Sequence, residues 1–143
     1  MQVFDFNNFP FAEFGKKPTR QIRLMVSPQT TGEERCSIVI SSLPPMAVSE
    51  KHAHEGSDEY IYFDIGGRFI VGEKEYIVKE KSIVLAPRGT NHECVNTNKE
   101  KELTLVCFFL PPFEPYGKYP ELIEKTMEYI KEEKNKKENI FGV

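Results

Sequence analysis

The sequence predicts an all-β sandwich or barrel followed by one C-terminal helix. Between residues 21 and 110, short runs of β-branched and aromatic residues alternate with turn residues, and no run with helical spacing interrupts them. Many short strands with regular turn signals are typical of sandwiches and barrels. Helical spacing appears only after Pro111-Pro112. A chain of 143 residues corresponds to one domain, which can bury roughly two-thirds of the surface of its unfolded form.

Eight strands are expected in this body of the chain. They are Ile22–Val26, Cys36–Ser41, Tyr60–Ile65, Phe69–Val71, Tyr76–Val78, Ser82–Ala86, Glu93–Asn96 and Leu103–Leu110. Gly66-Gly67 separates two of them, and we expect a positive φ there, because glycine adopts that conformation without strain. At the separator Pro87-Arg88-Gly89, the proline suits the second position of a type I turn and the glycine suits the fourth.

The C-terminal helix is expected to open at Tyr119-Pro120-Glu121, because proline is favoured at the first helical position and an acid is stabilised beside it. The residues that then follow helical spacing are Leu122, Ile123, Met127 and Ile130. This spacing predicts a helix that packs over one end of the barrel. Residues 131–137 are nearly all charged, and we expect this part to fray.

The N-terminal arm is rich in aromatic residues. It holds five of the eleven phenylalanines, namely Phe4, Phe6, Phe9, Phe11 and Phe14. Such an arm must bury its side chains, either on its own barrel or on a partner subunit. We expect a homodimer, and we divide the chain into the arm (1–20), the barrel (21–112) and the helix with its charged tail (113–143).

Composition excludes several classes of partner. The formal net charge is −3 and the basic residues form no stripe, so we expect no nucleic-acid partner. No apolar run approaches the roughly 20 residues of a membrane span, and residues 1–10 have no secretory pattern. The three cysteines are widely spaced, which indicates reduced thiols. We therefore expect a cytoplasmic protein whose partner is a small molecule.

All the histidines of the chain fall into two spaced motifs. The first motif reads H-x-H-x4-E-x6-G and consists of His52, His54, Glu59 and Gly66. The second motif reads P-x-G-x2-H-x3-N and consists of Pro87, Gly89, His92 and Asn96. Proline and glycine each occupy only about 5–7% of positions in proteins, so agreement at all these spacings is not expected by chance.

The three histidines and Glu59 of these motifs form a metal-ligand set. Residues two apart in a strand face the same side, so His52 and His54 are expected to point together. A turn after them lets Glu59 begin the next strand beside them. Three imidazoles and one carboxylate suit Fe, Mn, Ni, Co, Cu or Zn better than Ca or Mg. Because the imidazoles must be unprotonated, we expect metal affinity to fall as the pH drops through about 6.5.

At these residues the chain resembles the cupin superfamily, in its small single-domain form. The resemblance covers roughly residues 44–112 and implies an antiparallel jelly-roll β-barrel that binds one divalent transition metal through His52, His54, Glu59 and His92. One position departs from the family pattern. The second motif normally begins with glycine six positions before the proline, and this sequence has Lys81 there, which affects a turn rather than the metal.

The last strand resembles that of small cupins that open or linearise unsaturated uronates. In those enzymes an acidic proton-transfer residue lies at the position of Cys107, and an aromatic residue lies at the position of Phe109. A neutral thiol is a weaker acid–base group than a carboxylate unless its pKa is lowered. Cys107 and Cys94 are therefore candidates either for pocket chemistry or for small apolar fillers of the pocket.

The sequence leads to a hypothesis of a metal-dependent enzyme that isomerises or cleaves a small polar metabolite, such as a sugar or sugar acid. Glu59 and Cys107 are the candidate catalytic residues, and Phe109 and Arg88 are the candidate substrate-binding residues. Arg88 could meet an anionic substrate at the mouth or be a solvated turn residue. Arg20 and Arg23 could reach the pocket from an early strand, and their register is open. The alternatives are an iron-dependent dioxygenase and a non-catalytic metabolite-binding cupin.

Overall fold

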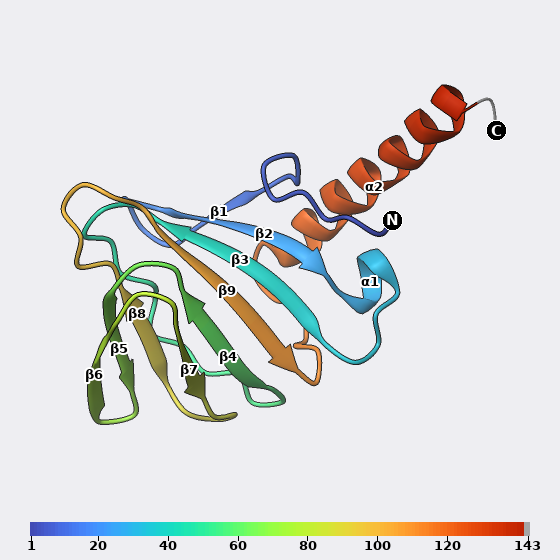
Figure 1. The fold of residues 1–143 in the computed structure, drawn as a ribbon. Coiled ribbons are helices and arrows are strands. Elements are labelled where there is room, and N and C mark those ends of the chain that lie inside the picture. Colours follow the sequence, from blue (N-terminus) through green and yellow to red (C-terminus); the bar gives the residue numbers. More distant parts are fainter. Residues whose placement is uncertain (142–143) are drawn as a thin grey trace.

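The computed structural model describes residues 1–141, with side chains through residue 136. It contains two antiparallel β-sheets and a long C-terminal helix (Figure 1). The elements are β1 (Ala12–Phe14), β2 (Arg20–Val26), α1 (Pro28–Thr31), β3 (Ser37–Leu43), β4 (Asp58–Phe63), β5 (Gly67–Val71), β6 (Lys74–Val78), β7 (Ser82–Ala86), β8 (His92–Val95), β9 (Leu103–Leu110) and α2 (Tyr119–Phe141). The large sheet has the order β1-β2-β3-β9-β4-β7, and the small sheet has the order β6-β5-β8.

The predicted fold class is confirmed. Each of the eight expected strands is present, and the sheets form the jelly-roll arrangement with a helix after the last strand. The arm adds a strand that was not expected, because Ala12–Phe14 pairs with β2 at the edge of the large sheet. No described helix is both long enough and apolar enough to cross a membrane.

Alternation along the strands defines the interior. In β9, Leu103, Leu105, Cys107 and Phe109 are buried and the residues between them are more exposed. This alternation is what a strand with one buried face requires. The inward residues of both sheets join one core, which the start of α2 closes through Tyr119 and Leu122. Cys107 and Phe109 therefore belong to the inward row of β9.

The helix α2 is longer than expected. The prediction that residues 131–137 fray is wrong, because the backbone remains helical to Phe141. Oppositely charged side chains spaced three or four residues apart stabilise an exposed helix, and the ion pair between Lys136 and Glu133 is one example. In Figure 1, the far end of α2 extends beyond the sheets.

The arm packs on its own chain. Phe9 is buried and its ring centroid lies 5.0 Å from that of Tyr129 on α2. The Arg23 guanidinium lies 4.3 Å from the centroid of Phe6, and its Nε donates to the Phe9 carbonyl at 3.1 Å. Of the two ways of burying the arm, these contacts support packing on its own barrel.

Two turns differ from their predicted geometry. The prediction of positive φ at Gly66-Gly67 is wrong, since neither residue has it. Gly67 is instead required by close approach, because a Cβ there would lie 2.5 Å from the Val95 carbonyl oxygen. The turn at Pro87 is also shifted by one position: Thr90 N donates to the Pro87 carbonyl, and Gly89 is the third turn residue with φ of 76°. A positive φ at that position is typical of a type II turn.

The backbone conformation of Lys81 shows how this lysine is accommodated where the family pattern has glycine. Its φ is 57°, in the left-handed region that glycine adopts without strain. The backbone therefore keeps the conformation that a glycine would favour, and Lys81 N still donates to the Phe63 carbonyl at 2.9 Å. The substitution costs local strain at a turn and leaves the strands on either side paired.

Candidate metal centre

Three separate segments bring the four predicted ligands together. Glu59 lies near the start of β4, and His92 opens β8. His52 and His54 lie in the loop before β4, so the prediction that they share a regular strand is wrong. Only His52 makes a β-bridge, in which its N and O pair with the O and N of His92 at 3.1 and 2.8 Å. The His54 carbonyl accepts from Gly89 N at 2.9 Å, so both motifs are held to each other by backbone bonds.

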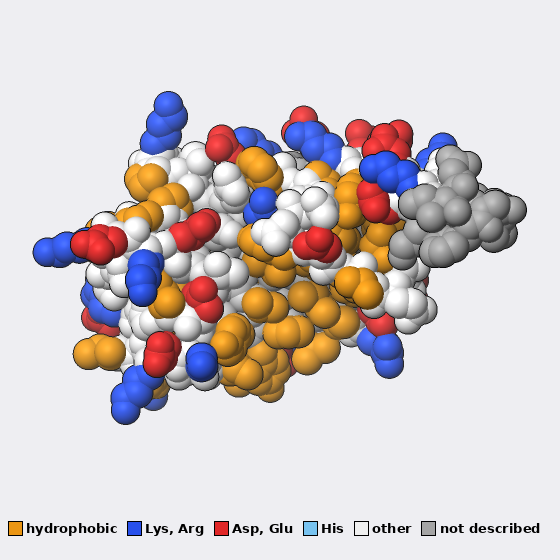
Figure 2. Space-filling view, turned by 45° about the horizontal axis from the view of Figure 1, so that its top comes forward, with side chains coloured by type: hydrophobic (Ala, Val, Ile, Leu, Met, Phe, Trp, Pro, Cys, Tyr) orange, Lys and Arg blue, Asp and Glu red, His pale blue; other side chains and the backbone are white. Residues whose placement is uncertain are grey.

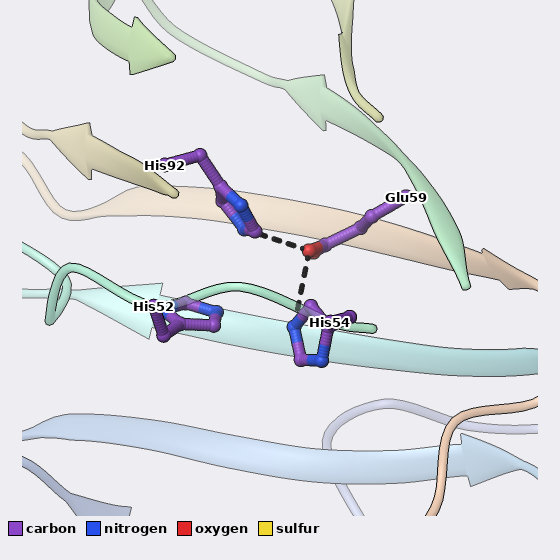
Figure 3. A group of neighbouring side chains, drawn as sticks. All are labelled: His52, His54, Glu59 and His92. Carbon is purple, nitrogen blue, oxygen red and sulfur yellow. Dashed lines mark ion pairs between the residues drawn. The ribbon is translucent and has the colours of Figure 1, made fainter. Parts of the chain in front are cut away.

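The ligand atoms converge on one point. One potential ligand atom from each of His52, His54, Glu59 and His92 lies within 4.8 Å of all the others. Glu59 Oε1 lies 2.9 Å from His92 Nε2 and 3.5 Å from His54 Nε2 (Figure 3). His54, Glu59 and His92 are buried, and His52 is partly buried. The predicted cluster is therefore present in the folded chain.

Unsatisfied polar atoms indicate that the cluster is built for a cation. His54 Nε2, Glu59 Oε1 and His92 Nε2 are buried and have no hydrogen-bond partner among the described residues. Buried polar atoms without partners are rare and cost free energy. One cation would coordinate all three atoms at once. The residues thus fit a transition-metal ion, whose preferred ligands are imidazole nitrogens and carboxylate oxygens.

Backbone carbonyls orient two of the imidazoles. His52 Nδ1 lies 2.6 Å from the Glu50 carbonyl oxygen, and His92 Nδ1 lies 3.3 Å from that of Thr90. A proton on Nδ1 satisfies each carbonyl and leaves Nε2 as the lone-pair nitrogen. Outer contacts of this kind fix the tautomer and ring direction of metal-binding histidines.

Burial keeps the site in the protonation state that a metal needs. It lowers the pKa of His54 to about 4 and also lowers the pKa of His52. Although burial alone would raise the pKa of Glu59, the close approach of His92 and the other imidazoles lowers it overall. Protons therefore compete for His52 and His54 at a lower pH than the expected 6.5.

The cluster lies in a cavity that opens to a surface groove. The side chains that line the cavity besides the four ligands are Arg20, Ile22, Val39, Ser41, Ser49, Ile61, Cys94, Leu105, Cys107, Phe109, Tyr116 and Tyr119. The groove runs between residues 52–57 and 111–116, and His52, His54 and Tyr116 border both spaces. A small molecule can thus approach the ligand cluster from this groove.

The other predicted site residues divide into two groups. Cys107 and Phe109 line the cavity, and the Phe109 ring meets the His54 ring edge-on at 4.8 Å. Arg88 lines neither the cavity nor the groove. Its guanidinium lies 3.4 Å from Asp58, and its backbone N donates to the same carboxylate at 3.0 Å. This position corresponds to the solvated turn alternative for Arg88.

The structure adds residues that the motifs did not identify. Tyr116 comes from the segment that leads into α2 and Tyr119 begins that helix, and no spacing rule places them in the cavity. Arg20 was one of two open candidates. Its inward orientation follows from the register of β2, in which Ile22 is buried and Arg23 faces the opposite side.

Two antiparallel sheets around a histidine-lined cavity define a class of small β-barrels with an internal site for a metal. The cupin domain family matches residues 39–109. The chain belongs to this family and is a small cupin-domain protein.

Solved structures agree with this assignment. A predicted oxalate decarboxylase from Thermotoga maritima is 19% identical with a TM-score of 0.68, and the match covers 77% of this chain and 99% of that chain. KdgF from a Halomonas species is 17% identical with a TM-score of 0.61, covering 77% and 94% of the two chains. An RmlC-like cupin from Shewanella frigidimarina is 13% identical with a TM-score of 0.63, covering 78% and 91%. Similarity at these identities shows the fold, and no curated protein matches the sequence.

Proposed function

We propose that this protein is a metal-dependent enzyme that isomerises or cleaves a small polar metabolite, such as a sugar acid or another hydroxy or carbonyl compound. The observation that carries the proposal is the set of three buried, unpartnered ligand atoms beside an open groove. Structural metal sites are normally closed, whereas catalytic sites leave room for a substrate. The description of one structural neighbour, a predicted oxalate decarboxylase, is compatible with an enzyme.

The residues that would hold the ion are His52, His54, Glu59 and His92. A bound divalent transition metal supplies a Lewis acid that chelates substrate oxygens and stabilises negative charge on them. The Glu59 carboxylate remains ionised because the neighbouring imidazoles lower its pKa. The ionised carboxylate can accept a proton from a substrate in the cavity, and its lowered pKa makes it a weaker base than a free glutamate.

The resemblance of the last strand to uronate-opening cupins implies an acid at the position of Cys107. Burial and the nearby Glu59 charge raise the pKa of its thiol well above the ordinary value. The thiol is consequently protonated at neutral pH and can donate a proton but not accept one. We propose that Glu59 acts as the base and that Cys107 shapes the cavity or donates a proton. A Cys107→Ala variant with unchanged turnover would assign it to shape alone.

The same ligand set also supports an iron-dependent dioxygenase, which is the second candidate. A metabolite-binding protein without turnover is the third. We also propose the cytoplasm as the compartment, because Cys36, Cys94 and Cys107 are all free thiols.

Metal content followed by an activity screen tests the proposal. Protein purified without chelators should carry about one transition-metal ion per chain, and His92→Ala should lose that ion while retaining the fold by circular dichroism. The wild-type protein should convert a uronate, phosphosugar or keto acid, and chelation should stop the reaction. Oxygen consumption would favour the dioxygenase. Metal binding without turnover of any compound would favour the binding protein, and full metal content in His92→Ala would contradict the site.

A further inference from the structure

The cavity has a second polar region besides the metal ligands. Arg20 begins β2 with its side chain on the same face as Ile22, and both residues line the cavity. Ser41 on β3 lines it too, opposite Ile22 in the strand register. The Arg20 guanidinium lies over the Phe14 ring, 5.9 Å from its centroid.

Two buried polar atoms of this region have no partner among the described residues. Arg20 Nε and Ser41 Oγ are buried without a hydrogen bond, as are the ligand atoms of His54, Glu59 and His92. These five are most of the seven such atoms among the described residues, and all five line one cavity. No carboxylate with a described side chain pairs with Arg20. Arg20 as a whole is partly buried and its Nε is fully buried, so a ligand that accepts a hydrogen bond from this nitrogen is favoured.

The charges of the groups that line the cavity indicate the sign of the charge on that ligand. A divalent ion with Glu59 leaves one positive charge, and Arg20 adds a second. Among the described residues, no other arginine, lysine, aspartate or glutamate lines the cavity. A loaded cavity is therefore cationic and complementary to an anion.

We propose that Arg20, together with Ser41, binds the carboxylate of a substrate whose hydroxyl or carbonyl oxygen faces the metal ligands. This inference rests on the proposed function and narrows its substrate class to small hydroxy or keto acids. Guanidinium and carboxylate form charge-assisted hydrogen bonds, which are about twice as strong as neutral ones. Arg20 thus determines specificity for acids over neutral sugars and ketones.

Two probes of similar shape test the proposal by calorimetry. Glycolate carries a carboxylate, and hydroxyacetone replaces it with a neutral acetyl group. We expect cobalt-loaded wild-type protein to bind glycolate at least tenfold more tightly than hydroxyacetone. Arg20→Met should weaken glycolate binding at least tenfold and change hydroxyacetone binding less than twofold. Arg23→Met is the matched control, because it removes the same charge from the other face of β2 and should leave both affinities unchanged.

Further readouts separate this proposal from the metal site. Arg20→Lys keeps the charge and should restore part of the glycolate affinity, which a purely structural role would not predict. Cobalt stoichiometry should be equal in all variants. If wild-type protein binds glycolate through Arg20 but takes up no cobalt, the proposed function fails and the anion site stands. Glycolate binding by Arg20→Met within twofold of wild type would overturn the anion site.

A different observation concerns the outer face of the large sheet. Two rows of apolar side chains cross β3, β9, β4 and β7 in register. The first row is Ile38, Phe108, Tyr60 and Leu85, and the second is Ile40, Val106, Tyr62 and Ile83. Figure 2 shows hydrophobic side chains gathered in one continuous area with charged side chains around it. We name these eight residues and Leu110 the outer apolar face.

The size of the outer apolar face suits a subunit interface. Tyr60, Ile83, Leu85, Phe108 and Leu110 are 36–65% exposed. With roughly 150–250 Å² for a large side chain, the face exposes on the order of 500 Å² of apolar surface. Monomers rarely expose more than this, and a standard interface buries about 800 Å² on each partner, rim included. We infer that a second copy of this chain covers the face by sheet-on-sheet packing.

Sedimentation velocity at tens of micromolar tests the inference. Wild-type protein should sediment with twice the 16.5 kDa mass of the chain. The double variant Tyr60→Lys/Ile83→Lys should be monomeric. The matched control is Tyr76→Lys/Ile77→Lys, which places the same charges on exposed positions of β6 in the small sheet and should remain dimeric. A monomeric wild type, or a dimeric Tyr60→Lys/Ile83→Lys variant, would refute it.

Discussion

Acid should destabilise the metal-free protein through His54. The pKa of this buried imidazole is lowered to about 4, whereas an unfolded histidine titrates near 6.5. Between these values the unfolded chain binds the extra proton, so stability is complete above pH 6.5 and is lost as the pH falls. From pH 7.5 to 5.0, His54 alone lowers the free energy of unfolding by about 2 kcal/mol. His52 adds to the loss, because burial lowers its pKa too.

Urea unfolding of the chelator-treated protein at the two pH values measures this loss. With a slope of about 1–3 kcal/mol per molar urea, the midpoint should fall by about 1 M. His54→Gln removes the titrating group and should reduce the loss by about 2 kcal/mol. Glu59 does not interfere, because its lowered pKa places its contribution below this pH range. Equal pH dependence in wild type and His54→Gln would refute the reasoning.

Three further predictions concern the backbone and the metal. Gly67→Ala should lower the free energy of unfolding by about 1–3 kcal/mol, because the new Cβ would clash with the Val95 carbonyl oxygen. Gly56→Ala is the control: its Cβ would contact no other atom, so the free energy of unfolding should change little. Lys81→Gly should raise the free energy of unfolding by up to about 1 kcal/mol by relieving the positive φ, and a lowered value would contradict this. Zinc at a hundredfold excess over its Kd should stabilise the wild type by about 2.7 kcal/mol in thermal unfolding and leave His92→Ala unchanged.

The ligand set was predictable because it depends on rare residues at fixed spacings. Proline and glycine mark the turn before His92, and the turn before Glu59 is equally short, so sequence distance nearly fixes spatial distance. The strands were predictable for a similar reason, since alternation identifies a buried face. The three-residue strand Ala12–Phe14 was missed because it is too short to show that alternation.

Other features depend on contacts between distant segments. Gly67 is required by the Val95 carbonyl, which a local rule for positive φ cannot reveal. The inward orientation of Arg20 follows from pairing of β2 with β3, and a shift of one residue would have placed Arg23 inside instead. Tyr116 reaches the cavity only because the segment before α2 turns back over the barrel.

Diffraction from crystals grown with cobalt, recorded across the cobalt absorption edge, tests the central claim most directly. We predict one anomalous peak per chain at about 2.0–2.2 Å from His52, His54, Glu59 and His92. No peak in the cavity, or a peak that contacts only one of these side chains, would contradict it.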